Sequence, residues 1–410
     1  MIFFESVIRK MKILHTSDWH LGAMLHQEKR YEEFDAVLEW LLKLLKDKAV
    51  DILLIAGDVF DTATPSNRAM EQYCQFLSEA VKGGIKQIIV TAGNHDSVSF
   101  LEAPKQVLRC LNIHVIGKAD PEFKDQLFPL KDETGTVRSV ICAVPFLRDR
   151  DIRQAVSGEN VEDLYQKRYE GIVNYYKGIC AKAAELYPGV PQLVTGHFFA
   201  AGGKISTDCV IGNLFSINVN ELPDTISYLA LGHLHTPQTV GGKNNCRYSG
   251  SLLKMNFGDN DTEKEVLILD TDDLSAEPEK IPVPVFQQME DINGNLQEIA
   301  DRIGELKKSD APVWLNVKNT GAFLSNLQYH LNELCKNSKL KVVFCKNAQD
   351  NPVLHQQKAV HSKQLSELKP LDVFNNLLSA NDFPSERQTA LRTLFLEAVA
   401  QLDLKDNRAE

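Results

Sequence analysis

The chain has 410 residues, 43% of them hydrophobic and 24% charged, which is an ordinary globular composition at a length that usually divides into two or three domains. No apolar run is long enough to cross a bilayer, and the eight cysteines form no Cys-x-x-Cys pair, so we expect a cytoplasmic protein without a disulfide framework or structural zinc site. The net charge of −10 argues mildly against a nucleic-acid partner, unless bound metal ions or another protein supply the positive charge.

Residues 1–11 are predicted to be an N-terminal extension. The stretch from Met1 to Lys10 carries Glu5 and lacks the basic-then-apolar order of a signal peptide. We therefore expect either a disordered extension or a start codon placed too early, with Met11 as the alternative start.

The next segment, residues 12–274, alternates strand and helix patterns. Helices are predicted where apolar residues recur at helical spacing, from Phe34 to Leu45, over 65–81 and over 161–186. Short apolar runs predict the strands, at 12–16, 51–56, 87–91, 113–116, 137–144, 192–195, 226–231 and 265–269. This alternation indicates an α/β domain with helices on the faces of a central sheet.

Three prolines between residues 275 and 285 predict a linker after this domain. The following residues, 286–346, are predicted to form a small α+β domain. Its expected elements are helices over 296–306 and 323–334 and strands over 313–317 and 340–344.

Residues 347–410 are predicted to be a C-terminal helical segment. Its last helix, from Pro384 to Leu402, begins with a capping box formed by Ser385 and Gln388 and carries an apolar stripe. Such a helix either docks on a partner or packs on its own domain, and the pattern alone leaves both alternatives open.

Side chains that can bind metal follow the predicted strands directly. Because ligands of α/β sheets gather at the carboxyl ends of the strands, we expect five such loops to converge on one site. The candidates in these loops are Asp18, His20, Asp58, Asn94, His95, Asp96, His197, His233 and His235.

These residue types indicate hydrolytic metal chemistry. Carboxylate, carboxamide and imidazole ligands without thiolate suit Mn²⁺, Fe or Zn. The candidates exceed what one ion needs, and two ions about 3.5–4 Å apart, bridged by a carboxylate, would use them all. Such a pair activates a hydroxide and stabilises charge on an attacked phosphate.

Each motif alone has a simpler structural explanation. A Gly-Asp pair after a strand is usually a turn, and Asn and Asp also cap helices. A His-x-His pair is most often a strand face or a surface pair. Five of the eleven histidines nevertheless fall in these motifs, each after an apolar strand, and the joint pattern favours a metal site.

The ordered motifs Asp-x-His, Gly-Asp, Gly-Asn-His-Asp, Gly-His and Gly-His-x-His resemble those of the calcineurin-like metallophosphoesterases over residues 12–270. The local sequence around these motifs resembles, more specifically, that of the SbcD family, the nuclease subunits of bacterial SbcCD complexes. The resemblance lies in the segments "KILHTSDWHLG", "LIAGDVFDTATPS", "VTAGNHDS", "GHFFAAGG", "YLALGHLHTPQ" and "YSGSLLKMNFG". This resemblance implies a sandwich of two central β-sheets flanked by helices, followed by a small α+β cap domain and a C-terminal helical tail.

The resemblance also implies a division of the ligands between two ions, with Asp58 as the bridge. One ion would be held by Asp18, His20, Asp58 and His235. The other would be held by Asp58, Asn94, His197 and His233. The usual ions of the family are Mn²⁺ and sometimes Mg²⁺.

His95 is implied to be catalytic without binding metal, because it would contact the scissile phosphate and protonate or stabilise the leaving oxygen. Asp96 would orient His95.

Two positions depart from the family pattern: Asp61 stands where eukaryotic and archaeal relatives often carry a second catalytic histidine, and Leu252 stands where a proline is common. Trp19 either shapes the DNA entrance or, as we favour, packs beneath the site.

The function implied by the resemblance is that of a DNA nuclease, with exonuclease action on duplex ends and endonuclease action on single strands or hairpins, in repair, recombination and replication. The chain contains no P-loop, so any ATP dependence must come from a partner, an SbcC-like coiled-coil ATPase bound through the C-terminal helices. A homodimer is also implied. The alternatives are a general phosphoesterase for small phosphodiesters or phosphomonoesters, and a non-catalytic scaffold, which the complete ligand set disfavours.

Overall fold

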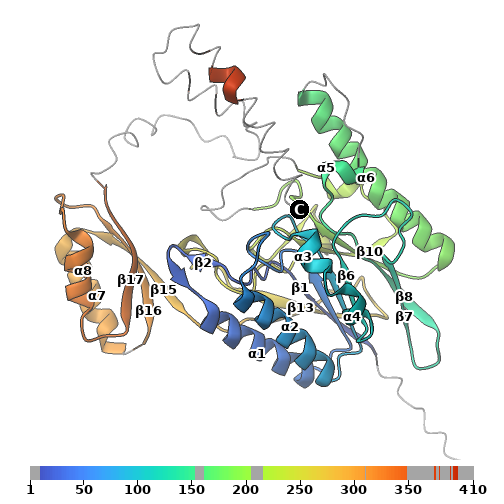
Figure 1. Ribbon diagram of the computed structural model, residues 1–410, viewed down its shortest axis with the longest axis horizontal. Helices are drawn as coiled ribbons and strands as arrows, with labels where there is room; N and C mark the ends of the chain where they lie inside the picture. Colours follow the sequence, from blue (N-terminus) through green and yellow to red (C-terminus); the bar gives the residue numbers. More distant parts are fainter. Residues whose placement is uncertain are drawn as a thin grey trace, which may run out of the picture.

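Two six-stranded sheets lie face to face in the computed structural model (Figure 1). The structure describes residues 10–152, 161–204, 216–309 and 311–348 and a few helical positions near the C-terminus. The first sheet runs in the order β14 (Glu279–Pro282), β13 (Glu265–Asp270), β1 (Lys12–Thr16), β4 (Ile52–Ala56), β5 (Gln87–Thr91) and β6 (Ile113–Ile116). The second runs in the order β11 (Gln238–Val240), β12 (Lys243–Tyr248), β10 (Ile226–Gly232), β9 (Gln192–His197), β8 (Val137–Cys142) and β7 (Leu127–Lys131).

The central strands of the first sheet are apolar on both faces because both faces are covered. Inward-facing side chains such as Ile13 and Leu54 meet Ile141 and Tyr228 of the second sheet in one buried cluster. Outward-facing side chains pack under helices α1 (Tyr31–Asp47) and α2 (Asn67–Lys82). Near-continuous apolar strands are the usual consequence of such two-sided burial.

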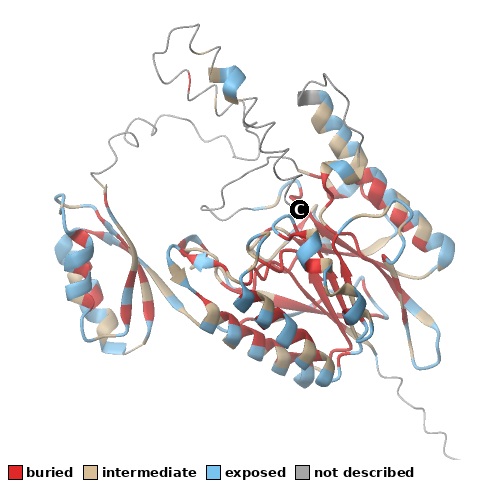
Figure 2. Cartoon of the chain, in the orientation of Figure 1, coloured by how far each residue is buried: buried red, intermediate tan, exposed pale blue. Residues whose placement is uncertain are grey.

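Helix α6 (Val161–Leu186) covers the outer face of the second sheet, and short helices α3 (Val98–Glu102), α4 (Lys105–Arg109) and α5 (Asp149–Ile152) lie in the loops. Figure 2 shows that burial is concentrated in the strands between these layers. Among the described residues, no helix combines the length and apolarity that a membrane span requires.

A smaller unit with its own apolar core follows the two sheets. Its parallel strands β15 (Gln288–Gly294), β16 (Val313–Asn319) and β17 (Leu340–Asn347) carry helices α7 (Leu296–Leu306) and α8 (Leu327–Cys335). The unit lies beside the hairpin formed by β2 (Met24–Leu25) and β3 (Glu28–Lys29) (Figure 1). There His26 stacks on Phe344 with ring centroids 4.5 Å apart, and Lys341 pairs with Glu28.

The predicted architecture of two helix-flanked sheets plus a small α+β unit is confirmed, and the bounds predicted for α6 and α7 are those observed. The helix predicted over 65–81 begins at Asn67, because the Ser66 side chain accepts a hydrogen bond from the backbone N–H of Ala69 and caps it. The helix predicted from residue 323 begins at Leu327.

The predicted linker over 275–285 contains a strand that we did not expect. Strand β14 pairs antiparallel with β13 at the edge of the first sheet, with Ile281 opposite Val266. Prolines are tolerated on such an edge because one row of N–H groups has no partner strand. Strands β2, β3, β7, β11, β12 and β15 were not predicted either.

Two predictions fall largely or wholly outside the described residues. One is the N-terminal extension, of which only residues 10 and 11 are described. The other is the C-terminal helical segment with its last helix from Pro384 to Leu402, of which a short helical piece at 391–395 is described.

Trp19 is packed rather than exposed. It is 1% exposed, its ring meets Phe76 edge-on at 5.0 Å, and its Nε1 donates to Thr16 Oγ1 at 3.0 Å. The packing interpretation of this residue is therefore confirmed.

We predict that Trp19→Ala lowers the free energy of unfolding by about 3–5 kcal/mol, because it leaves a cavity and an unpaired hydroxyl beneath the ligand loop. Urea denaturation measures this. Trp40→Ala, at a partly buried position of α1, is the control and should lose less. A Trp19 variant of unchanged stability would contradict the packing role.

Candidate metal centre

The loops that follow β1, β4, β5, β9 and β10 meet at one edge of the two sheets and bring the predicted ligands together. Strands β9 and β10 run parallel, with Gly232 beside His197 at their ends. Strands β1, β4 and β5 are also parallel, so their carboxyl ends lie at the same edge.

Several ligand loops adopt backbone conformations that ordinary residues seldom use. Asp18, His20 and Asp58 have φ values of 50°, 48° and 50°. Hydrogen bonds between loops hold them there, from Asp18 N to Gly57 O and from His20 N to Asp58 O, both 3.0 Å. Such conformations persist where the surroundings fix them, often at functional sites.

Glycine is required before two of the ligands. A Cβ on Gly57 would lie 2.2 Å from His197 Nδ1, and one on Gly93 would lie 2.0 Å from Asp58 Oδ1. The loops after β4 and β5 therefore approach neighbouring ligands more closely than any residue with a side chain allows.

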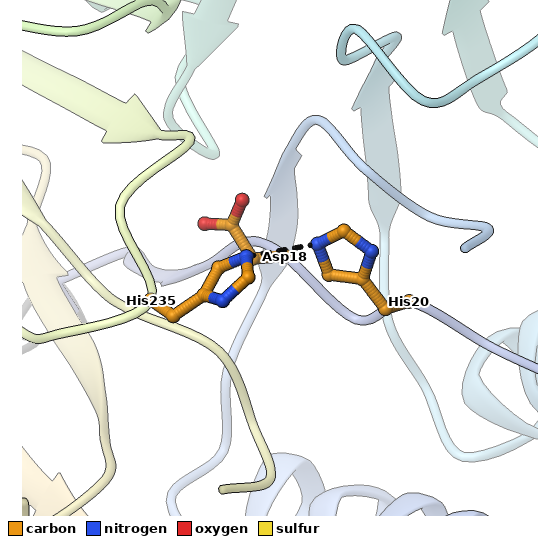
Figure 3. A group of neighbouring side chains, drawn as sticks. All are labelled: Asp18, His20 and His235. Atoms are coloured by element: carbon orange, nitrogen blue, oxygen red, sulfur yellow. Dashed lines mark hydrogen bonds between the residues drawn. The ribbon is translucent and has the colours of Figure 1, made fainter. Parts of the chain in front are cut away.

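The first group of ligands is Asp18, His20 and His235, whose donor atoms lie within 4.8 Å of one another. The Nε2 atoms of the two imidazoles are 3.1 Å apart, and Figure 3 shows these nitrogens pointing toward each other beside the Asp18 carboxylate. Two nitrogen lone pairs and a carboxylate directed at one place are suited to a cation.

The second group is Asp58, His197 and His233, again within 4.8 Å. Asn94 joins it, because its Oδ1 lies 3.1 Å from His197 Nε2 and 3.0 Å from His233 Nδ1. Both sheets contribute to this group.

The Asp58 carboxylate lies between the two groups. Its Oδ2 is 3.1 Å from His197 Nε2 and 3.6 Å from His20 Nε2. The side chain is 2% exposed, and its Oδ1 accepts a hydrogen bond from the backbone N–H of His95 at 2.9 Å. A single buried carboxylate thus reaches both groups.

The electrostatics of the centre favour bound positive charge. Burial would raise the pKa of the Asp58 carboxyl, but the imidazoles of His197 and His20 hold it well below its ordinary value. Burial would likewise lower the pKa of His197, but Asp58 and Asp18 outweigh it and raise that pKa to about 9. The buried carboxylates therefore stabilise a cation at the position of His197 Nε2.

Two further histidines are kept neutral. Burial and the neighbouring His197 lower the pKa of His233 to about 3, and burial and His20 bring the pKa of His235 well below its ordinary value. Neutral imidazoles retain the lone pair that a metal needs. Oxygen and nitrogen donors without sulfur, arranged in two groups around a shared carboxylate, fit a pair of divalent ions.

His95 lies at the exposed rim of the centre. Its Nδ1 is 2.8 Å from the backbone oxygen of Asp61, and its ring is 4.9 Å from that of His20. The Asp61 carboxylate, 35% exposed, lies 3.3 Å from His20 Nδ1. His95, Asp61 and His20 thus form a third group whose possible ligand atoms lie within 4.8 Å.

Asp96 does not orient His95 as we expected. It is 2% exposed, and its two carboxylate oxygens accept from the backbone N–H groups of Gly93, Val59 and Phe60 at 2.8, 3.1 and 3.0 Å. It therefore joins the loops after β4 and β5 to each other. The oxygen that orients His95 is the Asp61 carbonyl, which no side-chain pattern could have indicated.

Residues beneath the ligands were also missed. Ser17 Oγ lies 2.9 Å from Ser249 Oγ and donates to the Asp18 carboxylate. Arg148 donates from Nη2 to the Asp96 carbonyl at 2.8 Å. Only the family resemblance had indicated that the segment "YSGS" belongs to the site. Its Gly250 has a φ of 75°, and a Cβ there would lie 2.8 Å from the His235 carbonyl oxygen, so the position requires glycine.

Comparison with known proteins places this centre in a family. Residues 11–237 match the calcineurin-like phosphoesterases, and residues 285–382 match a family described as the type 5 capsule protein repressor C-terminal domain. The chain is 32% identical to the SbcD subunit of the SbcCD nuclease of Escherichia coli K12 in an alignment of 397 positions that covers 94% of this chain and 97% of that protein.

Two other bacterial relatives carry the same name. The protein of Rhodobacter capsulatus is 34% identical over 67% of this chain and 69% of its own length. That of Bacillus subtilis is 31% identical over 63% of this chain and 66% of its own length. The chain therefore belongs to the calcineurin-like phosphoesterases and, within them, to the family of SbcD nuclease subunits.

Proposed function

We propose that this chain is a DNA nuclease that cleaves phosphodiester bonds with two divalent metal ions, most readily Mn²⁺, with Mg²⁺ as a substitute. The observation that carries the proposal is the buried carboxylate of Asp58, which lies 3.1 Å from His197 and 3.6 Å from His20 and so reaches both ligand groups. Asp18, His20 and His235 would complete one ion's set, and Asn94, His197 and His233 the other's. When bound, such ions polarise the phosphate and supply a hydroxide nucleophile at neutral pH.

His95 is proposed to act on the leaving group. Its Nδ1 donates to the Asp61 carbonyl oxygen, so Nε2 is the nitrogen left to carry or release a proton. Its position beside His20, at the exposed rim, is within reach of a phosphate held over the centre. Asp96 supports this role by fixing the loop on which His95 stands.

DNA and an SbcC-like coiled-coil ATPase are the proposed substrate and partner. The support is that the relative named as a subunit of the SbcCD nuclease aligns over 94% of this chain, including the small α+β unit. We propose residues 12–274 as the nuclease domain, 286–346 as a cap and 347–410 as the docking segment. Exonuclease action on duplex ends, endonuclease action on single strands or hairpins, and a homodimer complete the proposal.

A cytoplasmic location, with work in repair, recombination and replication, agrees with this substrate. The described cysteines are all free. The general phosphoesterase alternative differs in substrate and not in the metal centre.

Asp58→Ala is predicted to lose both ions, because it removes the only carboxylate shared by the two groups within the described residues. Metal content after dialysis against Mn²⁺ measures this directly. Asp51→Ala, which removes an equally buried carboxylate at the opposite end of β4, paired with Lys86 and in contact with no proposed ligand, is the control and should retain two ions. An Asp58→Ala protein with two tightly bound ions would contradict the bridging role.

His95→Gln is predicted to keep metal and DNA binding while cleavage falls by about 10²–10⁴-fold, the usual contribution of a general acid. The measurement is cleavage of a labelled linear duplex in Mn²⁺, beside hydrolysis of bis-p-nitrophenyl phosphate. If wild type hydrolyses the small diester but no DNA, the general phosphoesterase alternative holds. If the variant loses its metals, the assigned role of His95 is wrong.

Removal of the residues after Pro384 is predicted to spare nuclease activity and to abolish co-purification with the partner ATPase. The proposed docking helix begins at that residue, while the ligands all precede residue 236. Tagged full-length and truncated chains, co-expressed with the ATPase, give the comparison. Co-purification that is unchanged by the truncation would refute docking through this helix.

A further inference from the structure

The ring of His235 lacks a fixing contact that three other histidines of the centre have, since even Nδ1 of His20, which has no hydrogen-bond partner among the described residues, faces the Asp61 carboxylate at 3.3 Å. The second ring nitrogen of His197 donates to the Ala56 carbonyl oxygen at 3.0 Å, and that of His95 bonds to the Asp61 carbonyl oxygen at 2.8 Å. Nδ1 of His235 is buried and has no hydrogen-bond partner within the part of the chain that the structure describes. Metal-binding histidines are usually oriented through that nitrogen, so His235 must be fixed in another way.

The backbone of His235 is held instead. Its carbonyl oxygen accepts from the Lys264 ammonium at 2.8 Å and from the backbone N–H of Ser251 at 3.2 Å. Lys264 directly precedes β13 in the first sheet, whereas His235 follows β10 of the second sheet. The ammonium therefore joins the ligand loop of one sheet to a strand of the other.

Lys264 is 4% exposed and is neutralised by an equally buried carboxylate. Asp259 is 0% exposed, and its Oδ2 accepts from Lys264 Nζ at 3.0 Å and from the backbone N–H of Met255 at 2.9 Å. Buried ion pairs contribute little net stability, because desolvation of both charges offsets their attraction. A pair of this kind under a ligand is better explained by the geometry that it imposes.

We propose that Lys264 and Asp259 are positioning residues for the metal ligand His235: Asp259 fixes the ammonium, and the ammonium fixes the main chain from which the imidazole projects. The inference rests on the proposed metal centre. It follows that losing the pair weakens the ion held by Asp18, His20 and His235 and leaves the other ion in place.

The test uses the full-length double variant Lys264→Met/Asp259→Asn. Methionine keeps the length and apolar body of lysine without the donor, and asparagine keeps an acceptor for the Met255 N–H group. Replacing both partners avoids an unpaired buried charge, which would itself destabilise the protein.

The matched control is Arg30→Met/Glu33→Gln. The arginine of this pair is also buried, its Nε lies 2.7 Å from the nearly buried Glu33 carboxylate, and it also donates to a backbone carbonyl, that of Lys254 at 2.8 Å. None of these hydrogen bonds reaches a proposed metal ligand, so a merely structural effect should be equal in the two variants.

The measurement is Mn²⁺ binding by equilibrium dialysis and electron paramagnetic resonance, with the melting temperature of each protein in chelator. For the Lys264 variant we expect one ion to bind about 10–100-fold more weakly, the usual effect of losing such support, and the other to bind within about twofold of wild type. Both ions should be unchanged in the control. Lys264→Leu/Asp259→Asn, which also lacks the donor, replaces the first variant if that protein does not fold.

Unchanged affinity for both ions in the Lys264 variant would overturn the inference. Equal weakening of both ions, or the same weakening in the control, would also overturn it, because either result means general loosening. Wild-type protein that binds fewer than two ions would instead refute the proposed two-metal function.

Discussion

The burial of two carboxylates at the base of the centre is the constraint on which the rest of the structure depends. Asp18 is 0% exposed and Asp58 is 2% exposed, and charges so placed are stable only beside compensating positive charge. Imidazoles supply part of it, which is why His197 holds a proton so strongly. Divalent ions would supply more positive charge. The buried carboxylates, which lower the stability of the folded chain by themselves, are therefore the groups that would bind the metal.

The fold meets this constraint by bringing strand ends from two sheets to one edge. Neither sheet alone carries a complete ligand set, because Asp18 and His20 follow β1 while His235 follows β10. The sheets must therefore keep their relative position for the site to persist. Direct links between them include the donation from His197 Nδ1 to the Ala56 carbonyl and that from Lys264 to the His235 carbonyl.

The sequence was informative where one residue type serves one purpose. Apolar runs located the central strands, and side chains such as Asp58 and His197 directly after them located the site. It was uninformative where a main-chain atom performs the task, as with the Asp61 carbonyl that orients His95, or where the partners are distant, as with Lys264 and Asp259 under His235. Edge strands such as β14 were missed because prolines obscure their pattern.

The shared position of Asp58 is the central claim, and electron paramagnetic resonance of the full-length chain loaded with Mn²⁺ tests it most directly. Two Mn²⁺ ions bridged by one carboxylate at about 3.5–4 Å are magnetically coupled and give the many-line spectrum of a pair. The account predicts that spectrum at two ions per chain. A spectrum of isolated ions at the same loading would show that the two ligand groups act separately and would contradict it.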